Sequence, residues 1–398
     1  MGLLRYRAVP LLDGRGRAAH RSDPPAADPG LCPGRPRGPD RHLARHLHQD
    51  PAAPLGRPWL RTYPAQHAAP DAAPGLRSRA DPGAAARHPP QIADTGRGPG
   101  MTERFRGTYT VMVTAFDPEG RVDLDAQARF TDWQVREGIH GLIPLGSTGE
   151  FLSLTAAERE AVARCVIDTV AGRVPVLVGA GAESTDEVID NVQMAEALGA
   201  DGTMIIAPFY STPTEAELIH HFGRIGAAAT RPVMIYNNPA TANVDLTPPL
   251  VAELSQLPQI DYIKESTMDV TRVRDILDLC GDRMTVFGGI MGFESFVEGA
   301  EGWVAVGSNV LPAALARLFT LTADAEDYHA ARALYRQVLP IIRLVGGHRY
   351  VAGTKAALAR IGQPMGGPRP PRLPLPEAEL AEVEAALAAV GLLPQTVA

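Results

Sequence analysis

From residue 101 onward, short apolar runs alternate with longer amphipathic stretches. Eight runs are rich in Val, Ile, Tyr and Phe and are continuous, which is typical of strands buried on both faces of a parallel sheet. We predict these strands at 108–116, 141–146, 175–180, 202–208, 232–238, 260–266, 284–289 and 302–309. The amphipathic stretches predict helices at 125–138, 155–171, 184–198, 214–229, 247–256, 269–280, 293–300 and 312–322. Thr155 and Glu158 have the spacing of a helix capping box.

Eight successive strand–helix units predict an α/β fold, a (β/α)₈ TIM barrel, over residues 101–322. An open, doubly wound sheet is the alternative, but no G-x-G-x-x-G turn follows the first strands. Residues 323–398 are helical by pattern, with a break in the Gly/Pro-rich stretch 362–376. We therefore expect a C-terminal helical region after the barrel.

Residues 1–100 have a different composition, with 17 of the 36 prolines, one isoleucine, one valine and no Phe or Asn. Such a segment cannot build a core, so we predict a disordered Arg/Pro/Ala-rich extension. It carries 15 Arg against 8 Asp. A basic arm that recruits a partner and a transit peptide are two interpretations. We favour a third, in which translation starts at Met101.

Charge and cysteine content exclude several classes of partner. The net charge of the chain is −7, and because the first hundred residues contribute +7, residues 101–398 carry −14. An acidic folded part argues against nucleic acid as a partner. No apolar run approaches the roughly 18 residues of a membrane span. Three cysteines without metal-ligand spacing fit a reducing cytoplasm. We predict a cytoplasmic protein without a membrane partner.

Lysine is rare in this chain, which has 36 arginines but only Lys264 and Lys355. Lys264 falls inside the predicted strand 260–266. Arginine stays protonated at working pH, whereas a desolvated lysine can lose its proton and attack a carbonyl carbon. Considered alone, Lys264 fits better with a structural ion pair, for example to Glu265.

Other polar residues fall at the carboxyl ends of the predicted strands, where a barrel of this kind carries its chemistry. They are Gly146-Ser147-Thr148-Gly149-Glu150, Pro208-Phe209-Tyr210, Tyr236-Asn237-Asn238-Pro239 and Gly288-Gly289. Each alone is an ordinary turn or barrel residue. Together with Lys264 they supply an amine nucleophile, a phenol to move protons and a turn that can hold an anion. None of the five histidines after residue 100 ends a strand, so we predict no metal site. The set predicts Schiff-base chemistry on a 2-oxo acid.

On these motifs, residues 104–362 resemble the dihydrodipicolinate synthase / N-acetylneuraminate lyase family of class I, pyruvate-dependent aldolases. The family's Gly-Thr-Thr-Gly-Glu, Pro-x-Tyr, Tyr-Asn-x-Pro and Lys-Glu motifs correspond to 146–150, 208–210, 236–239 and 264–265. The resemblance implies a lyase in which Lys264 forms the imine and no separate cofactor is needed. It implies a proton relay of Tyr236, Thr148 and Tyr210, the last often lent across a dimer interface. It also implies a homotetramer built from dimers, and substrate binding by Gly146, Ser147, Thr148 and the carbonyl of Val304.

One departure from the family leaves the substrate open. Synthases of this family carry an arginine two residues after the motif proline, where this chain has Thr241. A threonine beside the second substrate lacks the bidentate clamp for a carboxylate. The open reactions are the synthase reaction itself, aldol cleavage or dehydration of 2-keto-3-deoxy sugar acids, cleavage of N-acetylneuraminate, and deamination of a hydroxyproline-derived pyrroline acid. A non-catalytic sensor of 2-oxo acids is the alternative outside the enzymes.

Overall fold

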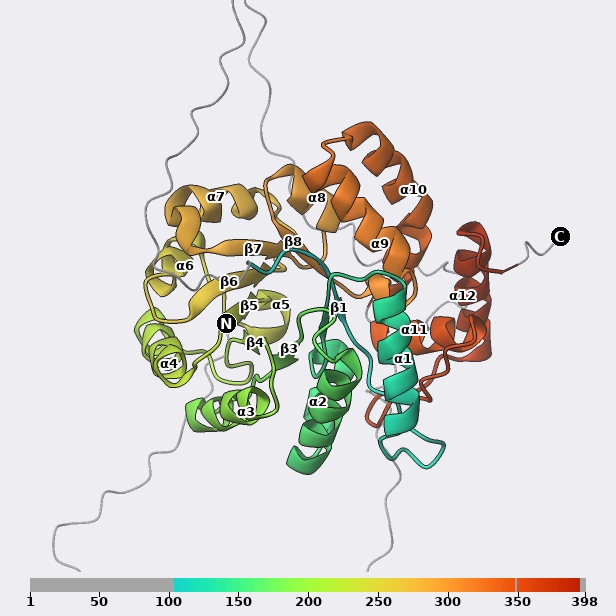
Figure 1. Cartoon of the computed structure of the whole chain (residues 1–398), viewed down its shortest axis with the longest axis horizontal. Coiled ribbons are helices and arrows are strands. Elements are labelled where there is room, and N and C mark those ends of the chain that lie inside the picture. Colours follow the sequence, from blue (N-terminus) through green and yellow to red (C-terminus); the bar gives the residue numbers. More distant parts are fainter. Residues whose placement is uncertain (1–103, 348, 394–398) are drawn as a thin grey trace, which may run out of the picture. The chain divides into compact units, whose positions relative to one another are not determined.

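The computed structural model describes residues 104–347 and 349–393, and eight parallel strands form its centre (Figure 1). The strands are β1 Gly107–Val111, β2 Gly141–Ile143, β3 Leu177–Gly179, β4 Gly202–Ile206, β5 Val233–Asn237, β6 Ile260–Glu265, β7 Thr285–Gly288 and β8 Gly302–Ala305. They are hydrogen-bonded in the order β2-β1-β8-β7-β6-β5-β4-β3. A parallel bridge between Leu142 and Val176 joins β2 to the start of β3. The ring therefore closes, and the predicted TIM barrel is confirmed over the open sheet.

Helices surround the strands, as Figure 1 shows. They are α1 Leu124–Arg136, α2 Ala156–Val170, α3 Thr185–Ala197, α4 Glu215–Ala228, α6 Pro248–Leu254, α7 Thr271–Cys280, α8 Gly292–Val297 and α9 Pro312–Phe319. A short helix, α5 Pro239–Ala242, follows β5, and a π-helical turn, η6 Thr320–Asp324, follows α9. The predicted capping box of α2 is present. The Thr155 hydroxyl accepts from the Glu158 N–H at 3.2 Å, and the Glu158 carboxylate accepts from the Thr155 N–H at 2.9 Å.

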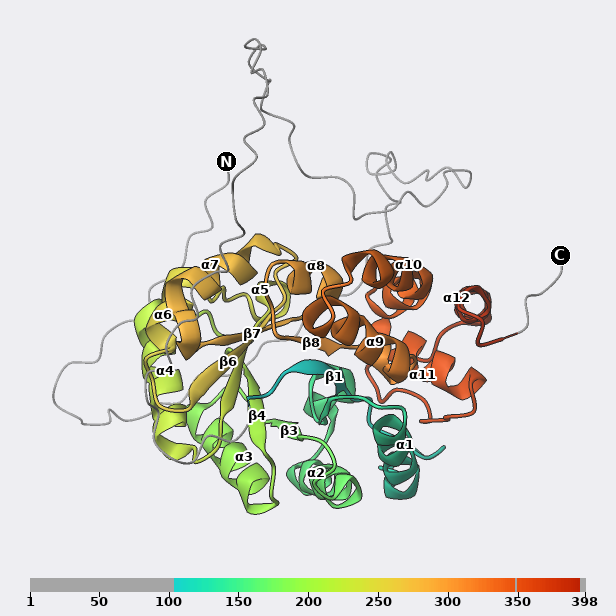
Figure 2. The same cartoon turned by 45° about the horizontal axis from the view of Figure 1, so that its top comes forward.

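Three further helices, α10 Tyr328–Val345, α11 Tyr350–Arg360 and α12 Glu377–Ala389, gather on the side of the barrel near α1 and α9 (Figures 1 and 2). α11 packs against two 3₁₀ turns, η2 Ser147–Gly149 and η5 Gly307–Asn309, which follow β2 and β8. The C-terminal helices thus reach the carboxyl end of the barrel. The predicted boundary between 101–322 and 323–398 stays a prediction, and the predicted extension 1–100 lies outside the described residues.

Several predicted strands run too far at their carboxyl ends. β1 ends at Val111 instead of 116, and β8 ends at Ala305, where η5 begins two residues later. The residues beyond these ends remain buried, for example Met112 and Val310. Hydrophobicity reports burial, so it cannot locate the residue at which a buried chain leaves the hydrogen-bonded ladder.

Aromatic side chains fill the interior of the barrel on the side of the amino ends of the strands. Tyr109 on β1 meets Phe287 on β7 edge-to-face at 5.2 Å between ring centres, and Phe287 also lies 6.2 Å from Tyr262 on β6. The ring centre of Phe105 lies 5.0 Å from that of Tyr262, which stands on β6 two residues before Lys264. Rings at these distances pack favourably and exclude water. The barrel interior is therefore a packed core at this level.

Candidate active site

Lys264 is held inside the barrel by the alternation of strand β6. Because successive strand residues point to opposite faces, Tyr262 and Lys264 share the interior face. Lys264 is only 6% exposed, and its Nζ lies 3.9 Å from the ring centre of Tyr236, its partner on β5. No ion pair of Lys264 occurs within residues 104–347 and 349–393. The amine therefore rests on the face of a phenol ring, a cation–π contact.

Glu265, the neighbour considered as an ion-pair partner, points to the other face of β6. Its carboxylate accepts from the Asn237 amide at 2.9 Å and from the Thr267 N–H at 2.7 Å. Burial raises the pKa of Glu265 above its ordinary range, against the hydrogen bonds from Thr267 and Asn237. Lys264 and Glu265 are thus separated by the strand itself.

Asn237 anchors the loop that follows β5. Its Oδ1 accepts from the Leu246 N–H at 3.0 Å, and its Nδ2 lies 3.2 Å from Asp245 Oδ1. Arg272 donates two hydrogen bonds, of 2.6 and 2.7 Å, to the same Asp245 carboxylate. The Arg272 guanidinium is also the main cause that holds the pKa of Asp245 below its usual range. These contacts fix where α5, and with it Thr241, sits above the strand ends.

The hydroxyl of Tyr236 is oriented by a neighbour in the same motif. Asn238 Nδ2 donates to it at 2.9 Å, and Tyr236 is 7% exposed. A phenol that accepts this hydrogen bond keeps its own O–H proton for another acceptor. The arrangement suits a proton donor beside Lys264.

The turn after β2 contains the predicted anion cradle. Within it, Gly149 N donates to Gly146 O at 2.9 Å and Glu150 N donates to Ser147 O at 3.2 Å. The N–H groups of Ser147 and Thr148, at the first two positions of the 3₁₀ turn, have no acceptor inside it. A Cβ at Gly146 would lie 2.6 Å from the Val111 side chain, so only glycine fits against β1. Thr148 is buried and Ser147 is half-buried.

Glu150, the last residue of this motif, has a structural role that the sequence reasoning missed. Its Oε1 lies 2.9 Å from Lys355 Nζ, and both side chains are at most 1% exposed. Lys355 also donates to Gly367 O at 3.0 Å, and Glu150 Oε2 accepts from the Arg369 N–H at 2.9 Å. Burial lowers the pKa of Lys355 to about 8, although Glu150 opposes the change. The rarity of lysine was the available signal, because Lys355 is the only lysine besides Lys264.

The remaining predicted residues lie on other elements of the barrel. Tyr210 is in the loop after β4 and is 89% exposed. Thr241 is exposed on α5, and Val304 is buried on β8 opposite Tyr109 of β1. Within the part of the chain that the structure describes, no hydrogen bond or ring contact joins the Tyr210 side chain to Lys264 or Tyr236.

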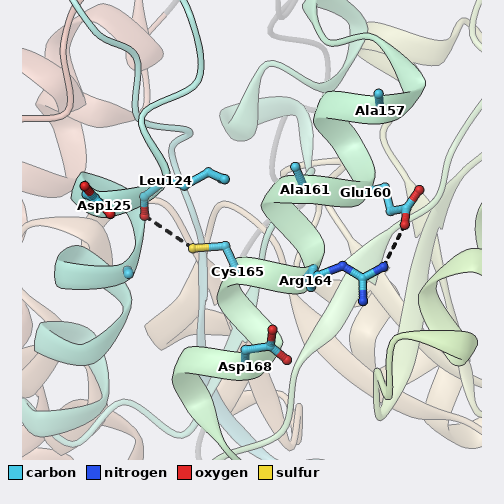
Figure 3. Close-up of a pocket in the computed structure, with 9 residues that line it drawn as sticks. Leu124, Asp125, Ala157, Glu160, Ala161, Arg164, Cys165 and Asp168 are labelled. Atoms are coloured by element: carbon cyan, nitrogen blue, oxygen red, sulfur yellow. Dashed lines mark hydrogen bonds and ion pairs between the residues drawn. The ribbon is translucent and has the colours of Figure 1, made fainter.

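The surface also has a cavity of about 550 Å³ between α1 and α2 (Figure 3). Cys165 in its wall directs its thiol toward the Leu124 carbonyl at 3.4 Å, and Arg164 pairs with Glu160 at 2.7 Å. None of the predicted site residues lines it. Among the described residues, no group of three His, Cys, Asp or Glu side chains is placed to hold a metal ion, and no helix is long and apolar enough to cross a membrane.

A closed (β/α)₈ barrel with a buried lysine on β6 beside a tyrosine on β5 is the arrangement expected of a Schiff-base barrel lyase. The sequence profile of the Dihydrodipicolinate synthetase family matches residues 104–390. The chain belongs to this family, as its motifs predicted.

Relatives agree over the same part of the chain. A 4-hydroxy-tetrahydrodipicolinate synthase of Ruegeria pomeroyi is 35% identical, over 73% of this chain and all of the relative. One of Anaeromyxobacter dehalogenans is 36% identical, over 73% of this chain and 98% of the relative. A solved dihydrodipicolinate synthase of Acinetobacter baumannii, complexed with pyruvate, has a TM-score of 0.71 and 29% identity, covering 73% of this chain and all of that one. The predicted lyase class is confirmed.

Proposed function

We propose that the chain forms a Schiff base between Lys264 and the keto carbon of pyruvate or a larger 2-oxo acid. The observation that carries the proposal is the buried amine of Lys264, which lies against the Tyr236 ring and forms no ion pair with the described residues. A neutral amine adds to the keto carbon, and loss of water gives the imine. The imine nitrogen then accepts electrons when a proton leaves the neighbouring carbon, which yields an enamine. The imine is the electron sink, so the chemistry asks for no separate cofactor.

The other site residues receive roles from their positions. Tyr236, with its proton free to be donated, transfers protons to and from the substrate oxygen. The N–H groups and hydroxyls of Ser147 and Thr148 bind the carboxylate of the 2-oxo acid, with Gly146 making room and the Val304 carbonyl bordering the site. The exposed Tyr210 completes the relay from a second copy of the chain. That arrangement supports a dimer, and in pairs a tetramer, although one related solved structure is described as a monomeric variant.

Pyruvate is the first 2-oxo acid to test, because the Acinetobacter baumannii relative is described in complex with it. The relatives named 4-hydroxy-tetrahydrodipicolinate synthase support condensation as one direction. Thr241 in place of an arginine keeps the second substrate open, between that reaction, sugar-acid cleavage or dehydration, and pyrroline-acid deamination. A cytoplasmic location stays a prediction.

Borohydride trapping tests the proposal directly. With pyruvate present, borohydride reduction should add the mass of a reduced pyruvyl group to the peptide that contains Lys264. Lys264→Ala should abolish the adduct, and Lys264→Arg should not restore it, because a guanidinium stays protonated. Lys355→Arg is the matched control, since the only other lysine is occupied by Glu150 and should leave the Lys264 adduct in place. An adduct that survives in Lys264→Ala, or none in the unchanged protein, refutes the mechanism.

A further inference from the structure

The loop above β5 lacks a cation for an acidic second substrate. Residues 238–247 contain no Lys or Arg, and Thr241 on α5 is exposed and neutral. A carboxylate brought close to Lys264 and Tyr236 leaves water, and it needs a fixed positive partner to offset that loss. Such a partner has to come from another part of the barrel mouth.

The C-terminal helices supply a cavity lined by arginines at this end of the barrel. It has a volume of about 200 Å³ and is lined by Arg349, Tyr350, Val351, Ala352, Arg372 and Leu373. The first turn of α11 forms one wall, and the segment after α11 forms the other. α11 packs against η2 and η5, and the buried pair of Lys355 with Glu150 fixes it to the predicted anion cradle. The helix whose first turn lines the cavity is therefore the one that packs against the turns following β2 and β8.

The two arginines in this cavity differ in how they are paired. Arg349 is occupied, since it binds the Glu379 carboxylate at 2.8 Å and the Pro374 carbonyl at 2.9 Å. Arg372 is half-buried and forms no ion pair with a carboxylate in the described residues. Glu150 is not an ion-pair partner of Arg372, because its carboxylate binds Lys355 and the Arg369 N–H. A half-buried guanidinium without a carboxylate is a site that an anion can fill.

Tyr350, in the first turn of α11, lines the same cavity as this arginine. Burial raises the pKa of the Tyr350 hydroxyl, and the charge and hydrogen bonding of Arg372 oppose that rise. The hydroxyl of Tyr236 raises the same pKa further. Arg372 and Tyr236 thus both act electrostatically on the Tyr350 phenol.

We infer that Arg372, together with the Tyr350 hydroxyl, binds an anionic group on the second substrate or on the part of the substrate that is cleaved off. The inference rests on the proposed Schiff-base function and adds a specificity determinant to it. The planar guanidinium offers two parallel N–H donors to a carboxylate, and the phenol adds one more. The enzyme then selects a carboxylate-bearing partner over a neutral one of equal length, although Thr241 contributes no charge.

A paired-substrate experiment tests this assignment. Pyruvate consumption is measured with 4-oxobutanoate and with 4-oxobutanamide, which have the same length but differ in charge. The unchanged enzyme should prefer the carboxylate by kcat/KM. Arg372→Gln should reduce that preference about ten- to a hundredfold, the loss of one charge-assisted hydrogen-bonded pair. The KM for pyruvate and the borohydride adduct on Lys264 should not change, which also shows that the variant is folded.

Arg343→Gln is the matched control, because Arg343 is an exposed arginine in the last turn of α10. It should leave the preference intact. The assignment is overturned if the unchanged enzyme traps pyruvate but does not favour the carboxylate, or if Arg372→Gln keeps the full preference. Absence of the pyruvate adduct in the unchanged enzyme is a different result, since it refutes the proposed function itself.

Discussion

At the scale of the residue, the chemistry of this barrel depends on where its two lysines are placed. Both are buried, but Lys355 meets Glu150 at 2.9 Å, whereas Lys264 lies against the Tyr236 ring and pairs with no carboxylate among the described residues. A buried ion pair gives its lysine a structural role, since removing either partner leaves an uncompensated buried charge. Lys264 forms no such pair with the described residues, and its amine is the one we propose as the nucleophile. The same residue type therefore serves structure in one position and the proposed reaction in the other.

At this scale, we predict the effect of removing the Tyr236 hydroxyl. Tyr236→Phe keeps the ring against Lys264 but removes the hydroxyl that accepts from Asn238. We expect turnover to fall about 10²- to 10⁴-fold, the usual contribution of a positioned proton donor, while the pyruvate adduct still forms. Steady-state kinetics and intact-mass measurement after reduction check the two halves. Tyr328→Phe, at an exposed tyrosine, should leave both unchanged, and wild-type turnover in Tyr236→Phe would remove the proton-transfer role.

At the scale of the element, one carboxylate shapes the loop that carries Tyr210. Glu183 accepts from the N–H groups of Phe209, Tyr210 and Ser211 at 2.9, 3.0 and 2.8 Å. Burial would raise the pKa of Glu183, but the hydrogen bonds from Ser211, Tyr210 and Phe209 outweigh it and lower the pKa. The segment before α3 thus holds the loop after β4 in a conformation that exposes the Tyr210 side chain.

Glu183→Gln tests whether this loop geometry matters. An amide keeps one acceptor oxygen, so at least one of the three hydrogen bonds is lost. We expect the free energy of unfolding to fall by about 1–2 kcal/mol and kcat to fall severalfold, with little change in the KM for pyruvate. Urea unfolding and steady-state kinetics measure these effects. Glu187→Gln, in α3 with only an ion pair to Arg159, is the control. A loss of stability with kcat unchanged would mean that the position of Tyr210 does not limit turnover.

At the scale of the whole molecule, Arg369 ties the C-terminal segment to the barrel. Its guanidinium donates to the carbonyls of Gly120 and Ser153, both at 2.8 Å, and binds the Glu158 carboxylate at the start of α2. The guanidinium carbon of Arg369 also lies 4.5 Å from the centre of the Phe116 ring, which is a cation–π interaction. The segment before α12 is therefore joined to the loops that follow β1 and β2 and to the start of α2.

This junction predicts a loss of stability in acid. The hydrogen bond from Arg369 is the largest cause that lowers the pKa of Glu158 from 4.5 to about 2. Because the folded-state pKa lies below the unfolded one, the stabilisation is complete above about pH 4.5 and is lost as the pH falls toward 2. Allowing for partial exposure, the contribution is about 1–2 kcal/mol.

Arg369→Gln should remove this contribution, so that the variant is less stable than the unchanged protein at pH 6 by at least this amount and the difference shrinks by pH 3. Urea unfolding at both values measures it. Arg360→Gln, which loses a more exposed pair with Glu384, is the control. Equal pH profiles for Arg369→Gln and the unchanged protein would contradict the assignment.

The sequence by itself determined the barrel and the family, and it singled out Lys264 as the predicted nucleophile. Local hydrophobic runs determine strands, and eight strand–helix units in succession leave few ways to bury them. The predicted motif at 146–150 likewise follows β2 directly, so its place at the barrel mouth could be foreseen.

Only the tertiary structure decided which groups meet. The pairing of Glu150 with Lys355 joins residues 205 positions apart, and the C-terminal cavity brings Arg372 together with the first turn of α11. Such contacts depend on how helices outside the barrel pack on it, which no local periodicity encodes. The sequence therefore located the amine, and the folded chain decided what surrounds it.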